Sequence, residues 1–189
     1  MARGTSDRNR PPLDTAAVER LAIDYVARYA TSRAKVRTYL ARKLKERGWA
    51  GDGPPPIDAL VDRLATAGFV DDRAFAEARS ASLGRRGYGA HRIGAALRAA
   101  GIAPEDSADA MTGAADSAWQ AAQAFARRRR IGPFAQEAAE REQRHKALGA
   151  MLRAGHPNHI ARAFAYADPG EDPTPDEEGD PIVDDPYPN

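Results

Sequence analysis

Three glycines at a nearly constant spacing constrain this chain more than any other feature of its sequence. Gly48, Gly101 and Gly155 lie 53 and 54 residues apart, and each follows an amphipathic stretch with an apolar residue four places before the glycine. Glycine reaches the left-handed backbone conformation that ends many helices at low steric cost. The spacing therefore predicts three similar helices, each closed by a glycine.

Further helical segments stand before and after each of these helices. They cover residues 15–30, 72–84 and 116–130 on one side, and 57–67, about 104–114 and 158–166 on the other. Alanine, leucine, arginine and glutamate dominate, and runs of β-branched residues are missing. We predict an all-α fold, an elongated tandem array of three three-helix modules with disordered termini. The predicted boundaries are 1–12 for a disordered arm, 13–68, 69–114 and 115–167 for the modules, and 168–189 for an acidic disordered tail.

The charge is distributed unevenly along the chain. Nine acidic residues and no basic ones fall in residues 168–189, so the net charge of +1 hides a body of about +10. A basic body attracts polyanions or acidic protein faces. However, 24 of the 28 basic residues are arginine, which GC-rich coding alone produces, so both explanations remain open.

Composition and motifs favour a non-enzymatic cytoplasmic protein. The chain has no cysteine, which excludes disulfides, thiol catalysis and cysteine-ligated zinc, and suits a reducing compartment. It has no apolar run of about 18 residues, so we expect no membrane span. Glycine-rich phosphate-binding motifs and the nucleophile-elbow motif are also missing. We predict no catalytic residue and no cofactor.

Asp71 and Asp72 resemble a carboxylate pair, but helix-start chemistry explains them sufficiently. Asp71 is expected to be the N-cap of the following helix, with Val70 and Phe75 placed for a hydrophobic staple. Asp72 falls in the first turn, where the helix dipole favours negative charge. Neighbouring residues on a helix do not face each other, so the pair makes a poor acid/base dyad.

The same helix-start pattern recurs twice. With Gly89 as N-cap, Tyr88 is placed to pack on Ile93, and with Ser32 as N-cap, Val36 takes the fourth helical position. These positions predict where two of the three glycine-closed helices begin.

His156 and His159 are three residues apart and could contact one ion. No third ligand lies near them in the sequence, so we favour a solvated or capping role and predict no metal site.

Basic residues form the candidate binding surface. Arg37 and Lys45 share one face of a helix, Arg85 and Arg86 stand between glycines, and a run of four arginines ends the 116–130 segment. We predict that a filament or phosphate partner contacts Arg37, Lys45, Arg85, Arg86, Arg127, Arg128 and Arg130. The alternative is a solvated surface in which arginines near a helix C-terminus favour the helix dipole.

One stretch of the chain resembles the RecX family of recombination regulators. The run GFVDDRAFAEARSASLGRRGYGAHRIGAALRAAGI, residues 68–102, has the family's glycine–aromatic–aliphatic–Asp–Asp start, a Phe-Ala pair, a basic turn and a closing Gly-Ile. The matching residues are Gly68, Phe69, Val70, Asp71, Asp72, Phe75, Ala76, Arg85, Arg86, Gly87, Tyr88, Gly89, Ile93, Leu97, Gly101 and Ile102. The resemblance extends over about residues 15–166, although His156 stands where the family usually has an aromatic residue.

The resemblance implies a small all-helical protein that binds the RecA recombinase filament on single-stranded DNA. Family members lie in the filament groove and reduce ATP hydrolysis, strand exchange and stimulated repressor cleavage. For this chain it implies contact with single-stranded DNA mainly through the filament, and we expect a monomer.

Two alternatives remain at the level of sequence. Three-helix units also occur in helix-turn-helix proteins, so the chain could be a DNA-binding protein or transcription regulator that acts without RecA. The acidic tail is expected to serve as a solvating end, with an anionic lid over the basic body as the second interpretation.

Overall fold

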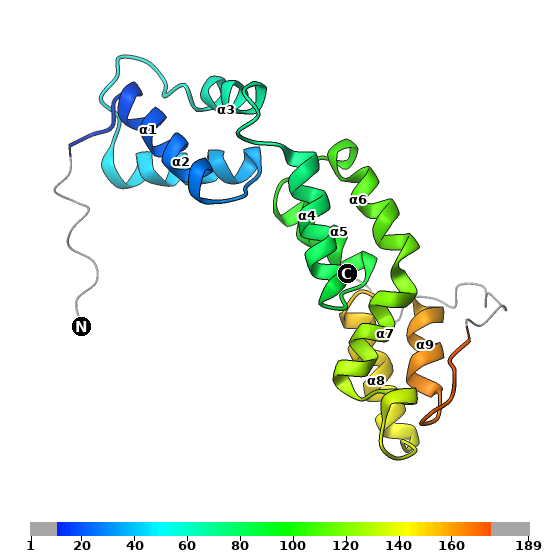
Figure 1. The fold of residues 1–189 in the computed structure, drawn as a ribbon. Coiled ribbons are helices and arrows are strands. Elements are labelled where there is room, and N and C mark those ends of the chain that lie inside the picture. Colours follow the sequence, from blue (N-terminus) through cyan, green and yellow to red (C-terminus); the bar gives the residue numbers. More distant parts are fainter. Residues whose placement is uncertain (1–10, 175–189) are drawn as a thin grey trace, which may run out of the picture. The chain divides into compact units, whose positions relative to one another are not determined.

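The computed structural model describes residues 11–174, and these are all-helical apart from their connections (Figure 1). Of the termini predicted to be disordered, 1–12 and 168–189, residues 1–10 and 175–189 lie outside the described residues. The α-helices are α1 (Thr15–Arg28), α2 (Arg33–Arg47), α3 (Ile57–Thr66), α4 (Asp72–Arg85), α5 (Ala90–Ala99), α6 (Pro104–Asp116), α7 (Ala118–Arg129), α8 (Arg141–Arg153) and α9 (Asn158–Tyr166). A short 3-10 helix, η1 (Gly132–Phe134), follows α7. The prediction of an all-α fold is confirmed.

The chain divides into two compact units, and the division passes through three helices. One unit holds Met1–Ala78 with Ala96–Asp109, and the other holds Arg79–Ala95 with Ala110–Asn189. The helices α4, α5 and α6 each contribute to both units. The three-module boundaries predicted from the sequence therefore remain a prediction, since the compact units follow a different division.

The first unit is built around α1, α2 and α3. Val36 and Leu40 of α2 are almost fully buried, as the apolar stripe of this helix requires, and they pack with Val18 of α1 and Val61 of α3. Leu13, at 0% exposure, closes this core from the segment before α1. Its N–H donates to the Gly48 carbonyl at 3.0 Å and its carbonyl accepts from the Ala50 N–H, so these bonds join the end of α2 to the segment just before α1.

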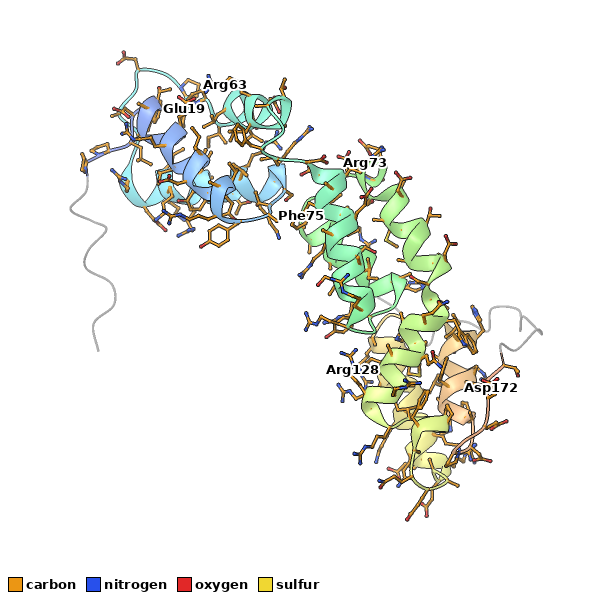
Figure 2. The ribbon with its side chains drawn as sticks, viewed as in Figure 1. Glu19, Arg63, Arg73, Phe75, Arg128 and Asp172 are labelled. Atoms are coloured by element: carbon orange, nitrogen blue, oxygen red, sulfur yellow. The ribbon has the colours of Figure 1, made fainter. Side chains whose placement is uncertain are left out.

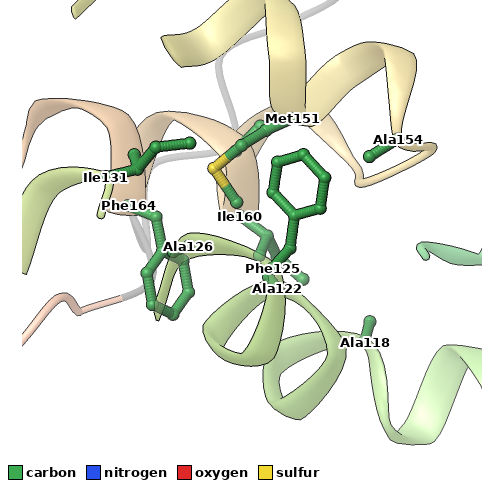
Figure 3. Packing of buried hydrophobic residues seen from close by; sticks show 10 residues of the cluster. Ala118, Ala122, Phe125, Ala126, Ile131, Met151, Ala154, Ile160 and Phe164 are labelled. Carbon is green, nitrogen blue, oxygen red and sulfur yellow. The ribbon is translucent and has the colours of Figure 1, made fainter. Parts of the chain in front are cut away.

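The second unit has its core between α7, α8 and α9. Figure 3 shows Phe125 of α7, Met151 of α8 and Phe164 of α9 among the side chains that meet there. Small residues on α7, including Ala122 at 0% exposure, allow the helices to approach closely. Trp119 packs on Phe164 with ring centroids 4.9 Å apart.

Two of the three repeat glycines end their helices in the way the sequence predicts. At Gly101 and Gly155, with φ of 71° and 90°, the next residue donates back to the carbonyl five positions earlier: Ile102 to Leu97 and His156 to Met151. This is the hydrogen-bond pattern of the Schellman cap.

Gly48 differs, because its φ is 82° but its ψ is 172°, outside the left-handed helical region. The Gly48 carbonyl instead accepts a hydrogen bond from Leu13, and this bond is part of a short β-bridge between Leu13 and Trp49.

Candidate partner-binding site

The paired aspartates start two different helices. The Asp71 carboxylate accepts from the Ala74 N–H at 2.9 Å, which confirms it as the N-cap of α4. The Asp72 carboxylate accepts from the Arg33 N–H at 2.9 Å, although Arg33 begins α2, 39 residues earlier. Asp72 is 7% exposed, whereas Arg33 is exposed, so the bond between them is part-buried. Asp72 therefore lies in the first turn of α4, as expected, and in addition binds the backbone at the start of α2.

The start of α2 is also bound to the end of α5, and we call this contact between two helix ends the first joint. Ser32 accepts from the Lys35 N–H, as an N-cap does, and donates its hydroxyl to the Ala100 carbonyl at 2.6 Å. Beside this bond, a Cβ at Gly101 would collide with the Cβ of Ala34. Gly101 is therefore required for close packing as well as for its positive φ.

A second joint of the same kind connects the start of α5 with the end of α8. The Gly89 N–H donates to the Ala154 carbonyl at 2.9 Å, and the His91 N–H donates to the Gly155 carbonyl at 3.2 Å. A Cβ at Gly155 would collide with the backbone nitrogen of Arg92. In each joint, the positive end of one helix dipole meets the negative end of another.

His156 lies inside the second joint, so the solvated role predicted for it is wrong, whereas its backbone N–H does take part in the cap of α8. It is 2% exposed, its Nε2 is 3.1 Å from the Gly87 carbonyl, and its ring meets Phe125 edge-on at 5.5 Å. The ring thus occupies a position suited to an aromatic residue. Burial lowers the pKa of His156 below its ordinary value of 6.5, although the bond to Gly87 partly opposes this. His159, by contrast, is exposed.

Arginines and aromatic rings come together in the second unit. Arg86 and Arg92 lie over the ring of Tyr88, with guanidinium carbons 5.5 and 5.2 Å from its centroid. Arg129 lies over Phe125 at 5.7 Å. An open pocket of ≈ 330 Å³ is lined by Arg86, Tyr88, Phe125, Arg128 and Arg129. We call Arg86, Arg92, Arg128 and Arg129, with Tyr88 and Phe125, the arginine–aromatic cluster.

Gly87 makes this cluster possible. It has φ of 74° and ends α4, where the Tyr88 N–H donates back to the Leu83 carbonyl. A Cβ at position 87 would meet the backbone of Phe125 and the guanidinium of Arg128, at 2.8 Å each. The turn after α4 therefore lies directly against α7, and only glycine fits between them.

The cluster carries cationic groups without matching carboxylates. Within residues 11–174, none of its four arginines lies within salt-bridge distance of an Asp or Glu. A guanidinium stacked on an aromatic ring keeps its edge N–H donors free for a carboxylate or phosphate. The site can therefore bind an anionic partner with little loss of side-chain freedom.

The predicted basic residues are not all placed alike. Arg86 and Arg128 belong to the cluster, and Arg85 and Arg130 are exposed near it in sequence. Arg127 lies over Phe134 at 5.0 Å.

Arg37 and Lys45 lie in the other unit. Arg37 is bound to Asp58 at 2.7 Å and to Asp62 at 3.6 Å, so it links α2 to α3. Lys45 is exposed on α2.

Sequence reasoning missed Arg92, Arg129 and the supporting rings of the cluster. Arg129 belongs to the noted run of four arginines, and Arg92 follows the GYGAH turn by one residue. The aromatic residues beside these arginines in the sequence could have indicated ring-supported cations. The sequence could not show that residues 86–92 lie against residues 125–129, because that contact is tertiary.

A second surface feature was also missed, in the first unit. Tyr25 stacks on Tyr39 with centroids 4.3 Å apart, Tyr29 tilts against Tyr25 at 5.3 Å, and Arg42 lies over Tyr39 at 5.6 Å. These residues line an open pocket of ≈ 440 Å³ together with Arg28. Tyr29 is 57% exposed.

Other kinds of site find no support in residues 11–174. The structure shows no group of three His, Cys, Asp or Glu side chains suited to a metal ion in this part of the chain. In the same residues, no helix is long and apolar enough to cross a membrane.

An all-helical chain with a cationic, aromatic-supported surface is typical of a protein that works by binding another macromolecule. Residues 71–111 match the family described as "RecX, second three-helix domain". The regulatory protein RecX of Myxococcus xanthus (strain DK1622) is 30% identical over 160 residues, covering 80% of this chain and 86% of that protein. The chain belongs to the RecX family of regulatory proteins.

Two further comparisons agree. RecX of Mycobacteroides abscessus (strain ATCC 19977) is 35% identical over 106 residues, covering 54% of this chain and 48% of that protein. The crystal structure of RecX from Lactobacillus salivarius has a TM-score of 0.58 and 17% identity, and the match covers 79% of this chain and 93% of that one. This likeness concerns the fold alone.

Proposed function

We propose that this protein binds the RecA filament on single-stranded DNA and lowers its ATP hydrolysis, strand exchange and coprotease activities. It thereby regulates recombination, repair and the SOS response. It acts in the cytoplasm as a monomer and catalyses no reaction of its own. The observation that carries the proposal is the arginine–aromatic cluster, whose four guanidinium groups have no carboxylate partner in residues 11–174.

The cluster suits an acidic protein face or a phosphate backbone. Arginine forms bidentate bonds with both carboxylates and phosphates, and arginine and tyrosine are enriched among the residues that dominate binding energy at interfaces. Three guanidinium groups over two rings, with Arg128 lining the same pocket as Arg86 and Arg129, thus provide a cationic surface that the ring contacts hold in place before the partner arrives.

The test is single-stranded-DNA-dependent ATP hydrolysis by the cognate RecA, titrated with this protein. The variant pair Arg86→Glu with Arg128→Glu should raise the concentration needed for half inhibition at least tenfold, since each lost charge-assisted contact costs about 1.5–3 kcal/mol. The matched control is Arg20→Glu with Arg98→Glu, two exposed arginines outside the cluster. Equal inhibition by both variants would remove the cluster from the proposal.

A second candidate function is direct binding of DNA without RecA, and the tyrosine pocket favours it. Stacked aromatic rings beside arginines are typical of surfaces that hold single-stranded nucleic acid, where a base–ring contact is worth about 1–3 kcal/mol. Binding of a labelled single-stranded oligonucleotide should be measured at the same salt as the ATPase assay. Tight binding lost in Tyr29→Ala, with no effect on RecA, would favour this second function.

A further inference from the structure

The tyrosine pocket of the first unit is the open pocket of ≈ 440 Å³ that residues of α1 and α2 line. Two of its rings, Tyr25 of α1 and Tyr39 of α2, pack against the core of this unit and stack on each other at 4.3 Å. Glu19 of α1 also binds Arg63 of α3 at 2.9 Å, and both residues are labelled in Figure 2. The walls of the pocket are therefore held by the fold, so little order has to be created when a ligand binds.

Tyr29, the third ring of the pocket, is placed differently from the other two. It follows α1 as the C-cap residue, is 57% exposed, and is not among the rings that pack against the core. Within the described part of the chain its ring contacts one other ring, that of Tyr25, at 5.3 Å and a tilt of 48°. An exposed aromatic ring beside a formed pocket is suited to stack on a flat ligand.

Two charges of opposite sign border the pocket without a partner. Asp24 and Arg28 are exposed and lie one turn apart on α1, yet neither pairs with the other or with any other charged group among residues 11–174. Arg42, the third charged residue of the pocket, already binds Glu46 at 2.7 Å and lies over Tyr39. The pocket thus offers a carboxylate that can accept hydrogen bonds and, in Arg28, a guanidinium that can donate them.

A nucleotide carries the groups that these side chains complement. Its base is flat and stacks on a tyrosine ring, and its phosphate accepts hydrogen bonds from a guanidinium. A carboxylate can only accept hydrogen bonds, so Asp24 favours a base whose edge carries N–H donors. Guanine presents two neighbouring N–H donors on one edge, whereas thymine presents one N–H between two carbonyl oxygens, which a carboxylate repels.

We propose that the tyrosine pocket binds one nucleotide, with its base stacked on Tyr29, and that it prefers guanine to thymine. Asp24 accepts hydrogen bonds from the base edge, and Arg28 binds the phosphate. The same chemistry serves a free nucleotide and one unit of a single strand. Only the strand as the source rests on the second candidate function, because binding of a free nucleotide requires neither RecA nor DNA.

The site is tested with nucleoside monophosphates, whose binding to the whole protein is followed by NMR. Addition of dGMP should shift the amide signals of residues 24–29 and 39–42, with a dissociation constant at least about threefold lower than that of dTMP. Tyr29→Ala should remove most of the binding and Tyr29→Phe should keep it, while Asp24→Asn should make the two nucleotides bind alike.

The matched control is Ile23→Ala, which alters an exposed side chain of α1 that does not line the pocket. This variant should bind dGMP as the unaltered chain does. Three results would each overturn the proposal: no shift of these signals at about 10 mM dGMP, equal affinities for dGMP and dTMP, or the same loss in Ile23→Ala as in Tyr29→Ala.

The source of the nucleotide is decided with an oligo-dT of about fifteen nucleotides that carries one central dG. If the pocket serves a single strand, this oligonucleotide should bind at least about fivefold more tightly than dGMP, and more tightly than oligo-dT alone. An affinity equal to that of dGMP would assign the pocket to a free nucleotide. The filament proposal fails or stands separately, because its test alters Arg86 and Arg128 of the other unit and measures ATP hydrolysis by RecA.

Discussion

The carboxylate of Asp72, in the first turn of α4, holds the backbone N–H of Arg33, the first residue of α2. This bond joins two helices that the sequence separates by 39 residues. Its neighbour Asp71 caps only its own helix and is exposed. The adjacent carboxylates thus offer a direct comparison between a local cap and a tertiary one.

Replacement of Asp72 should destabilise the fold more than replacement of Asp71. We expect Asp71→Ala to lower the free energy of unfolding by about 1 kcal/mol, as loss of an exposed N-cap does. Asp72→Ala should cost about 1.5–3 kcal/mol, because it leaves the Arg33 N–H of a part-buried bond without its partner and removes the contact between α4 and α2. Urea unfolding measures both, and Asp72→Asn, which keeps an acceptor oxygen, should recover part of the loss. Equal losses for the two alanine variants would contradict the tertiary role.

Alanine at Gly101 should be more harmful than alanine at Gly68. Both glycines have φ above 70°, so each substitution carries a strain of about 1–2 kcal/mol. Nothing lies near a Cβ at Gly68, whereas one at Gly101 collides with Ala34. We expect an additional loss of about 1–3 kcal/mol for Gly101→Ala from overpacking. Thermal unfolding of the two variants isolates this packing contribution, and identical losses would mean that the joint relaxes freely.

Arg130→Gly should stabilise the protein. Arg130 ends α7 with φ of 54° and is the one non-glycine residue with positive φ among residues 11–174. Glycine removes this strain, so the free energy of unfolding should rise by about 0.5–1 kcal/mol. Arg129→Gly, one residue earlier and still helical, is the control and should lower it by a similar amount. A loss of stability in Arg130→Gly would show that the guanidinium makes a compensating contact.

The stability of the protein should depend on the protonation of His156. Its lowered folded-state pKa means that the unfolded chain takes up a proton at higher pH than the folded protein does. The contribution of His156 is therefore complete above about pH 6.5 and decreases as the pH falls towards the folded-state pKa. The measurement compares unfolding of the unaltered chain with His156→Phe between about pH 5 and pH 8. Loss of the bond to Gly87 changes the free energy of unfolding of the variant by the same amount at every pH. The difference in free energy of unfolding between the two proteins should therefore change only below about pH 6.5. A constant difference at every pH would contradict the prediction.

Local features of this fold could be predicted from the sequence, and contacts between distant segments could not. The helices, their glycine ends and the Asp71 cap each depend on residues within about five positions. The joint between Gly101 and Ala34 depends on residues 67 positions apart, which no local pattern records.

The candidate site shows the same limit. Arg86 and Arg128 were predicted as basic residues, but nothing in the sequence places them around one pocket or separates them from Arg37, which Asp58 and Asp62 neutralise. The burial of His156 was missed because its contacts are tertiary: its ring lies against Phe125 of α7 and the Gly87 carbonyl of the turn after α4.

The joint between α5 and α8 has a consequence for how this protein opens. The first amide groups of a helix normally have no partner and exchange their hydrogens with water early, through fraying of single turns. At α5 the amides of Gly89 and His91 are held by carbonyls of Ala154 and Gly155. Fraying of this turn therefore requires α8 to separate from it, so a motion that is usually local becomes a cooperative event shared by two helices.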